Sequence, residues 1–413
     1  TLKVTIVVSK SRSSIESTHS VKKAQSLSLR CTYHELKLII KEGLAIIKTS
    51  IDRREIFYNP RGRFTRSLGV AVIAAESSIK GRRIDVADVL AATGVRGIRY
   101  YLESDGVNIV FLNDISKFAY KLIEENLKAN KVERAETSCL DANLFLAQRF
   151  RERNKLDFID IDPYGSPAPF IDLAVSAVKA DGLLAITSTD LAPLCGIYPW
   201  ASFRKYGGKP FKDEFCHEMA ARILIFALQQ ACGRRERFAE IVLTCYSEHY
   251  LRIYARIRRG KKKFPKEDIG VMYRCLKCLE IFVRRIDNPL EKCPLCGSRL
   301  NVAGPLWIGN IHRKEFLEQV GKFVERVYEI KDRDRIRSFV KVAISENDYP
   351  PYHFDISRAS KRLKISSPSV NSVIEKLRSI GFRATRTHFN PTGIKTNAPY
   401  NELLKIIREL SIA

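Results

Sequence analysis

Apolar runs alternate with amphipathic stretches between residues 84 and 257. Four of the runs have the length and composition of buried strands, and they read IDVADVLAA, NIVFLND, LDFIDID and GLLAITSTD. The stretch SKFAYKLIEENLKANK has the period of a helix, and one of its faces carries Phe118, Ala119, Leu122, Ile123 and Leu127. Alternation of this kind predicts a mostly parallel sheet with helices on both faces, which is an α/β, doubly wound fold.

The pattern changes outside this region. Two adjacent β-rich runs, FAEIVLTCYS and HYLRIYARIRR, indicate a hairpin at the end of the α/β domain. A short segment rich in cysteines and turn formers follows, and then one or two amphipathic helices in GKFVERVYEIKDRDRIRSFVKVAISE. We predict an N-terminal arm at 1–34 that is partly disordered, an α/β domain at 35–263, a cysteine-bearing insertion at 264–305 and a C-terminal domain at 306–413.

The C-terminal domain contains the segment FDISRASKRLKISSPSVNSVIEKLRSIGF, which predicts two short helices joined by a turn. Their shared apolar face consists of Ile356, Ala359, Leu363, Val370, Ile374 and Leu377. Ser367 and Pro368 suit the start of the second helix, and Gly381 suits its end. With FRATRTHFN as a following strand, the pattern predicts a winged-helix-like module. Such modules bind nucleic acid or protein, or brace a catalytic domain.

The composition is typical of a soluble globular protein, because 45% of its residues are hydrophobic and 28% are charged. No window approaches eighteen uninterrupted apolar residues, so we expect no membrane span, and the N-terminal arm lacks the layout of a signal peptide. Six of the ten cysteines are scattered along the chain. Scattered cysteines favour reduced core residues and a cytoplasmic location.

The charge balance favours a polyanionic partner. The chain has 71 Lys and Arg against 46 Asp and Glu, a net charge of +25, and such an excess points to a nucleic acid or an anionic surface. The density is highest between Arg252 and Lys263, where seven of twelve positions are basic. This run could be a solvated strand edge or linker, or a surface that follows phosphates. The sequence weighs the two interpretations equally.

A cofactor loop is predicted where the first strand runs into AATGVRGIRY. Gly94 and Gly97 let the backbone approach a ligand at a helix N-terminus. The second strand ends at Asp114, whose carboxylate could accept hydrogen bonds from both ribose hydroxyls. Asp141 ends a third short run, where it could accept from an adenine amino group, cap the following helix, or do both. The glycine pattern is incomplete for a dinucleotide, so a cofactor without phosphate, such as S-adenosylmethionine, fits better.

The run DFIDIDPYGSPAPF ends a buried strand with carboxylates and an aromatic ring. The carboxyl ends of parallel strands line the ligand crevice, so Asp160, Asp162, Pro163 and Tyr164 should lie beside the cofactor. Asp162-Pro163-Tyr164 is similar to the Asp/Asn-Pro-Pro-Tyr/Phe motif of methyltransferases that act on exocyclic amino groups. A capped strand end would explain the prolines and Gly165, but it would not explain two carboxylates beside a ring.

The chemistry of amino methylation requires such a set. The lone pair of an arylamine is delocalised, and acceptors that hold its hydrogens aim the nitrogen at the methyl group. The Asp162 carboxylate and the Pro163 carbonyl could serve as these acceptors, and the carboxylate could then take the proton. Tyr164 could stack on a base that has left its helix.

A second motif predicts a metal site. Cys275-x2-Cys278 and Cys293-x2-Cys296, with fourteen residues between the pairs, are typical of a four-thiolate zinc knuckle. Zinc would be structural there, because all four positions would be filled by thiolates. A redox role is less favoured, because neither pair adjoins a βαβ helix.

Taken together, the motifs resemble one family. YNPRGRFTRS, LAATGVRGIRY, LNDIS, DANLFL, FIDIDPYGSPAPFID, TSTDLAPLCG, CHEMAARIL and THFNPTGIKTNAPY, in this order, are similar to the tRNA (guanine-26, N2)-dimethyltransferase family in an archaeal form. The resemblance runs from about residue 56 to residue 400. It implies a class I, Rossmann-like methyltransferase domain that uses S-adenosylmethionine to dimethylate the exocyclic amine of a guanine in tRNA.

The resemblance also implies roles for individual residues. Cofactor roles fall to Arg66, Arg96, Asp114, Asp141 and Ala142, and the catalytic role falls to Asp162. Phe57 and Tyr164 would sandwich the guanine. The sequence departs from the family pattern around Arg66, because the familiar Asn-Arg-Asp reads Thr65-Arg66-Ser67. This departure leaves open what supports the Arg66 side chain.

Two residues of THFNPTGIKT are further candidates. Lys395 is expected to contact a phosphate, and His388 has either a tRNA or interdomain contact or a structural role in a wing turn. We expect tRNA as the partner, without a membrane and without an obligate protein partner. Two other functions stay open: an amino methyltransferase acting on ribosomal RNA or DNA, and a tRNA-binding protein without catalysis.

Overall fold

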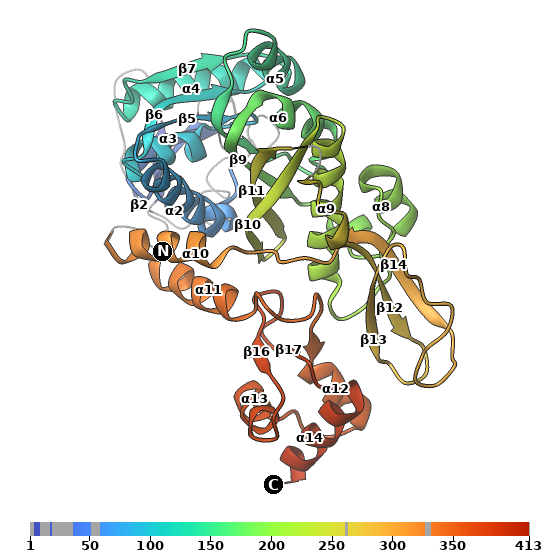
Figure 1. Ribbon diagram of the computed structural model, residues 1–413. Coiled ribbons are helices and arrows are strands. Elements are labelled where there is room, and N and C mark those ends of the chain that lie inside the picture. Colours follow the sequence, from blue (N-terminus) through green and yellow to red (C-terminus); the bar gives the residue numbers. More distant parts are fainter. Residues whose placement is uncertain are drawn as a thin grey trace. The chain divides into compact units, whose positions relative to one another are not determined.

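The computed structural model describes residues 4–8, 17–18, 36–50, 58–260, 263–326 and 332–412 (Figure 1). The chain forms two compact units. The first holds Thr1–Asp162, Ser176–Ala185 and Gln319–Ile336, and the second holds Pro163–Val175, Ile186–Glu318 and Arg337–Ala413. The domain boundaries expected at 34, 263 and 305 stay predictions.

The first unit contains the predicted parallel sheet. β5 (Ile84–Asp88) pairs in parallel with β6 (Val107–Asn113) and with β8 (Leu156–Ile161), and β7 (Ala135–Ser138) pairs with β6. β9 (Val178–Ser188) lies next to β8 in the sheet, whose strand order is β10-β11-β9-β8-β5-β6-β7. All four predicted strands are therefore present. The order reverses at β5, which has β6 on one side and β8 on the other, and ligands bind at the carboxyl ends of strands at such a switch point.

Three helices begin just after strands of this sheet. They are α3 (Val95–Glu103), α4 (Lys117–Ala129) and α5 (Ala142–Arg151). In α4 the predicted face is buried at Ala119, Leu122, Ile123 and Leu127. Phe118, the second residue of α4, is exposed, against expectation.

A second sheet belongs to the same unit. β3 (Leu36–Glu42) and β4 (Ala45–Ser50) form an antiparallel hairpin, and β1 (Val4–Val8) pairs with β3. β2 (Ser17–Thr18) pairs with β1. α2 (Arg63–Lys80) begins after a short 3-10 turn and is buried along most of its length. Whether the rest of the N-terminal arm is disordered lies outside the described residues.

The predicted hairpin is present in the second unit. β10 (Arg237–Ser247) and β11 (Tyr250–Arg259) pair antiparallel, and α9 (Cys216–Gly233) packs against β10. Before α9, the chain forms α7 (Leu191–Leu194) and α8 (Pro199–Tyr206). A short helix, α6 (Ile171–Ala177), lies between β8 and β9 in the chain.

The cysteine-bearing segment forms a small sheet of its own. Its strands are β12 (Ile269–Cys275), β13 (Ile281–Arg285) and β14 (Leu300–Trp307), in the order β13-β12-β14. Both neighbours of β12 run antiparallel to it.

The C-terminal part is helical with a small sheet. Its elements are α10 (Lys314–Arg326), α11 (Arg333–Ser345), β15 (Phe354–Asp355), α12 (Ile356–Leu363), α13 (Val370–Ser379), β16 (Ala384–Arg386), β17 (Gly393–Thr396) and α14 (Tyr400–Ile412). The predicted helix pair and strand are present. The N-cap of α13 is Ser369 rather than Ser367, because Ser369 has the extended backbone of a cap, with φ of −65° and ψ of 143°, and its hydroxyl accepts from the amide of Ser372 at 3.0 Å. Gly381, with φ of 93°, ends α13 as predicted.

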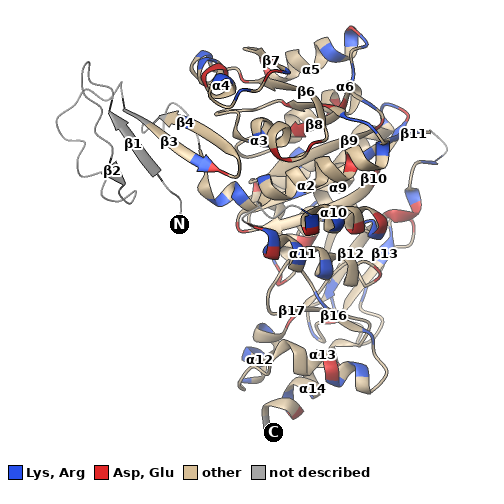
Figure 2. Ribbon diagram, turned by 90° about the vertical axis from the view of Figure 1, so that its left-hand side faces the viewer, with Lys and Arg blue, Asp and Glu red and all other residues tan. Residues whose placement is uncertain are grey.

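The basic run on β11 is only partly a surface feature. Arg252 and Arg256 are buried, and Arg252 donates to the hydroxyls of Tyr254 and Thr187 at 2.7 and 2.5 Å. Neither a solvated edge nor a phosphate-following surface describes these two side chains, because strand packing turns them into the fold. Other basic residues lie on α10 to α13 (Figure 2).

Within the described part of the chain, we find no helix with both the length and the apolarity to cross a bilayer.

Candidate active site

Four charged side chains gather where β5 and β8 end. Asp88 is the last residue of β5, and Asp160 and Asp162 lie at the end of β8. Arg96, in the first turn of α3, forms an ion pair with Asp162, and its Nε lies 3.9 Å from Oδ2 of Asp160. The Asp162 side chain is 21% exposed, whereas Asp88 and Asp160 are buried. The structure thus brings the predicted catalytic carboxylate together with a predicted cofactor residue.

Asp160 has a structural position. Its Oδ2 accepts a hydrogen bond of 2.6 Å from the Tyr100 hydroxyl, and both side chains are fully buried. The alternation along β8 turns Asp160 toward α3, which carries both Tyr100 and Arg96. Asp160 therefore lies buried beside Arg96, and its expected place beside the cofactor stays a prediction.

Asp88 was not singled out from the sequence. Burial and the negative charge of Asp160 raise the pKa of Asp88 to about 7, although Arg96 acts in the opposite direction. The amide of Gly97 donates to Oδ2 of Asp88 at 3.2 Å. Around neutral pH, Asp88 can hold a proton, which reduces the repulsion among the clustered carboxylates.

The glycine loop and Asp114 lie at the neighbouring strand end. Gly94 caps α3 with φ of 77°, a left-handed conformation that favours glycine. Oδ2 of Asp114 accepts from the amide of Ala92 and Oδ1 accepts from the amide of Ser116, both at 2.9 Å. Each carboxylate oxygen keeps a second lone pair. Asp114 is thus fixed in place and can still accept from two adjacent hydroxyls.

Asp141 is the N-cap of α5, as expected. One oxygen, Oδ1, accepts from the amides of Asn143 and Leu144 at 2.9 and 3.2 Å. The exposed side chain thus has its other oxygen available for an amino group. Ala142 is the buried first residue of α5. The adenine role stays a prediction, and the capping role is confirmed.

The support of Arg66, left open by the sequence, comes from β3. Arg66 makes a two-pronged ion pair with Glu42, with Nε and Nη2 at 2.6 and 2.5 Å from its carboxylate oxygens. Arg99 donates to the same carboxylate at 2.7 Å, and Tyr58 donates to it at 2.6 Å. Burial alone would raise the pKa of Glu42, but the two guanidinium groups outweigh it and hold the pKa at about 2.

Ser67, where the family resemblance leads one to expect Asp, has its own acidic partner. The Ser67 hydroxyl donates to Asp332 at 3.1 Å and accepts from Arg99 at 3.0 Å. Arg63 donates twice to the Asp332 carboxylate, at 3.0 and 3.1 Å. Asp332, which comes from a distant segment of the chain, thus contacts Ser67, the position at which this sequence departs from the family motif. The sequence reading missed both Glu42 and Asp332.

The turn after Asp162 presents an aromatic ring. Pro163 is buried, whereas Tyr164 is 90% exposed. Gly165, with φ of 98°, donates to the Thr189 hydroxyl at 2.7 Å and accepts from the Thr189 amide at 3.0 Å. These bonds fix the turn that carries Tyr164. Phe57, its predicted partner, lies outside the described residues.

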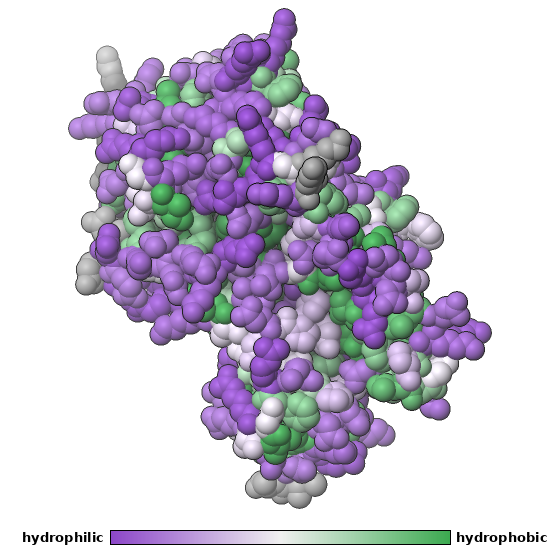
Figure 3. All heavy atoms as spheres, viewed as in Figure 1, coloured by the Kyte–Doolittle hydropathy of each residue, from purple (hydrophilic) through white to green (hydrophobic). Residues whose placement is uncertain are grey.

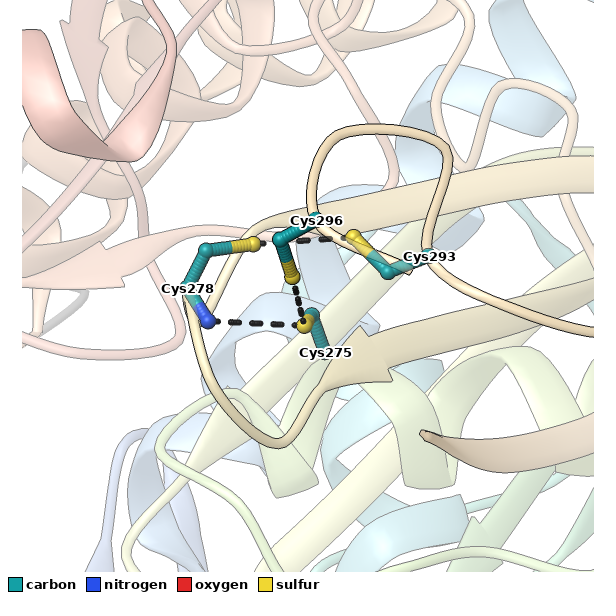
Figure 4. A group of neighbouring side chains, drawn as sticks. All are labelled: Cys275, Cys278, Cys293 and Cys296. Carbon is teal, nitrogen blue, oxygen red and sulfur yellow. Dashed lines mark hydrogen bonds between the residues drawn. The ribbon is translucent and has the colours of Figure 1, made fainter. Parts of the chain in front are cut away.

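The four predicted metal ligands meet in one cluster (Figure 4). The sulfur atoms of Cys275 and Cys296 are 3.5 Å apart, and those of Cys278 and Cys293 are 3.6 Å apart. The amides of Lys277 and Cys278 each point at the Cys275 sulfur from 3.4 Å. A tetrahedral zinc ion with sulfurs at about 2.3 Å would separate them by about 3.8 Å. The donor set therefore fits zinc.

The two candidates from the C-terminal motif are turned inward. Lys395 is buried and donates to Glu218 at 2.5 Å, so its expected contact with a phosphate is wrong in this conformation. His388 pairs with Glu346, which also interacts with His312 at 3.3 Å. Only 4% of the His388 side chain is exposed. Of its two interpretations, the structural one is favoured.

The reversed strand order, the acceptors after two neighbouring strands and the Asp-Pro-Tyr turn define an α/β protein of the methyltransferase architecture. The comparisons with known proteins specify it further. The chain belongs to the N2,N2-dimethylguanosine tRNA methyltransferase family, whose profile matches residues 37–408.

Relatives cover nearly the whole chain. The tRNA (guanine(26)-N(2))-dimethyltransferase of Methanothermobacter thermautotrophicus is 36% identical over 87% of this chain and 94% of its own. An Aquifex aeolicus relative, named for guanines 26 and 27, is 34% identical over 90% and 96%. The structure of Trm1 from Pyrococcus horikoshii with S-adenosyl-L-methionine matches with a TM-score of 0.80 and 33% identity over 89% of this chain and 99% of that one.

Proposed function

We propose that this chain transfers methyl groups from S-adenosylmethionine to the exocyclic N2 amine of guanine 26 in tRNA, giving N2,N2-dimethylguanosine. Family membership over residues 37–408 and the names of the relatives support the substrate and the product. The observation that carries the proposal is the position of Asp162, paired with Arg96 beside the Gly94 loop.

The residues that would hold the methyl donor come from three strand ends. Asp114 would accept from the ribose hydroxyls, Asp141 would accept from the adenine amino group, and Ala142 would lie against the ring. Arg96, Gly94 and Arg66 would bind the amino acid part. When bound, S-adenosylmethionine supplies an electrophilic methyl group. The position of Asp114, with each oxygen already held by one amide, supports its share.

Asp162 would act on the target nitrogen. Its carboxylate accepts one amine hydrogen, the Pro163 carbonyl accepts the other, and the nitrogen lone pair is directed at the methyl group. Forming the N–C bond makes the nitrogen strongly acidic, so Asp162 can take the proton. A monomethylated amine keeps one hydrogen for Asp162, which allows a second round. Tyr164 would stack on the guanine after it leaves its helix.

The test compares Asp162→Ala with wild type. Loss of the acceptor should lower the transfer rate to unmodified tRNA at least about 100-fold, while calorimetry should show near-normal binding of S-adenosylmethionine. Asp172→Ala, which removes an exposed ion pair with Arg234, is the matched control. Near-normal turnover in the Asp162 variant would contradict the mechanism.

Nucleoside analysis of the same reactions identifies the substrate. N2,N2-dimethylguanosine at position 26 of tRNA is the expected product. Methylation of ribosomal RNA or DNA in place of tRNA would support the alternative substrates, and tRNA binding without transfer would support a purely binding protein. Mapping of position 27 would show whether the neighbouring guanine is also modified, as the name of the Aquifex aeolicus relative suggests for that protein.

Two other parts of the chain complete the proposal. A structural zinc ion would be held by Cys275, Cys278, Cys293 and Cys296, and their spacing in the fold supports it. Residues 306–413 would form a winged-helix-like domain that binds tRNA, and the order of α12, α13, β16 and β17 supports this.

A further inference from the structure

The second unit exposes an aromatic patch that the proposed site does not use. Tyr198, which precedes α8, is 61% exposed, and Trp200 and Phe203 on α8 are 68% and 47% exposed. Ile197 beside them is also exposed. Apolar surface appears at the position of α8 among hydrophilic residues (Figure 3). Large aromatic side chains that stay in water mark a binding surface more often than chance exposure.

Cations accompany these rings. Nζ of Lys209 lies 4.4 Å from the centroid of the Trp200 ring. The last turn of α8 carries Arg204 and Lys205, and its sequence, PWASFRKY, contains no acidic residue. Aromatic rings beside cations suit unstacked nucleic acid. Every base has a π-face that can stack on such a ring, and the cations attract the phosphates. A purely apolar protein partner would gain nothing from the cations, so charge complementarity favours an RNA strand.

The patch is anchored to the turn that carries Tyr164. Tyr206, the buried last residue of α8, shares a hydrogen bond of 2.7 Å with the Ser166 hydroxyl and donates to Asp190 at 3.0 Å. Lys205 donates to the same Asp190 carboxylate at 2.7 Å. All of these residues belong to one compact unit. A base on Trp200 would therefore keep a fixed position relative to Tyr164.

We propose that this α8 patch (Tyr198, Trp200, Phe203 and Lys209) stacks an unpaired base of the tRNA other than the target guanine. The inference rests on the proposed function and adds a substrate-positioning site to it. The base would lie on Trp200, and Arg204 would be placed to approach a neighbouring phosphate. The occupant is the substrate RNA itself, and self-association through the patch is an outcome that the test separates.

Tryptophan fluorescence gives a direct readout, because the chain has only two tryptophans. Trp200 is 68% exposed, whereas Trp307 is 5% exposed. Titration of the full chain with an unmodified tRNA transcript should quench the emission in a saturable way. Trp200→Phe should abolish the quenching and change the tRNA dissociation constant less than about threefold, because a ring is kept. Trp200→Ala should weaken binding about 5- to 150-fold and leave S-adenosylmethionine binding unchanged.

Phe150→Ala is the matched control. Phe150 is also an exposed aromatic residue with a lysine over its ring, Lys155 at 4.8 Å, but it lies on α5 in the other unit. The Phe150→Ala variant should bind tRNA as tightly as the wild type does. Unchanged tRNA affinity in Trp200→Ala, or an equal loss in both variants, would overturn the proposal, as would a change confined to the sedimentation of the free chain. Saturable quenching of Trp200 by tRNA, together with no methyl transfer to any tRNA transcript by the wild type, would leave the stacking site standing and contradict the proposed function.

Discussion

Replacement of Glu42 by Gln tests whether one buried carboxylate supports the cofactor side of the first unit. Glu42 accepts hydrogen bonds from Arg66, Arg99 and Tyr58, and it is 1% exposed. The amide keeps the shape of the carboxylate and removes its charge. Two buried guanidinium groups would then face each other without the anion that both contact.

The magnitude follows from the pKa. A carboxylate whose pKa falls from 4.5 to about 2 on folding contributes about 3 kcal/mol to stability at neutral pH. Because the folded-state pKa is depressed, this contribution is complete above pH 4.5 and is lost as the pH falls toward 2. Removal of one partner from a buried ion pair lowers the free energy of unfolding by about 3 to 5 kcal/mol, which agrees with the value obtained from the pKa. We therefore expect Glu42→Gln to lose at least about 3 kcal/mol at pH 7.

Urea unfolding of the full chain, followed by circular dichroism at pH 7 and pH 3, measures this loss. The difference in the free energy of unfolding between Glu42→Gln and wild type should be smaller at pH 3 than at pH 7. Glu402→Gln, which breaks an exposed pair with Lys405, is the control, and it should cost less than about 1 kcal/mol. S-adenosylmethionine should also bind more weakly to Glu42→Gln, because Arg66 loses its position. A loss below about 1 kcal/mol at pH 7 would refute the reasoning.

Three further predictions concern other parts of the fold. Relative to wild type, Asp88→Asn should gain stability as the pH rises from 4 to 8, because the raised pKa makes ionisation of Asp88 unfavourable in the folded state; thermal unfolding at the two pH values checks the sign. Tyr100→Phe should lose about 2 kcal/mol in urea unfolding, since it leaves the buried Asp160 without a 2.6 Å donor, and an unchanged midpoint would count against that role. Cys296→Ser should lower the zinc content measured by elemental analysis, and a full equivalent of zinc in that variant would exclude the four-thiolate site.

The parallel sheet could be predicted because its strands are continuous apolar runs with polar residues at their carboxyl ends. The same rule placed Asp114 and Asp162 correctly at strand ends and identified Asp141 as a cap. It missed Asp88, although that residue ends the first strand. Its raised pKa depends on burial, which one sequence does not reveal.

The support of the site could not be predicted, since its partners are remote in the chain. Glu42 lies 24 residues from Arg66 and 57 from Arg99. Asp332 lies 265 residues from Ser67. Spacing rules describe neighbours on one helix or strand, and they contain no information about such pairs. Lys395 was misjudged for a related reason, because its partner Glu218 is 177 residues away.

The path of the chain through the two units has a consequence for how the protein can be made. The first unit closes with Gln319–Ile336, after the chain has passed through most of the second unit. On the ribosome, Arg63 and Ser67 emerge long before Asp332. Their contacts with the Asp332 carboxylate can therefore form only after residue 332 has been synthesised. A chain that ended before Asp332 would leave Arg63 and Ser67 without this acid. Neither unit can be excised at a single cut site, and shuffling either one between homologues would require several simultaneous junctions.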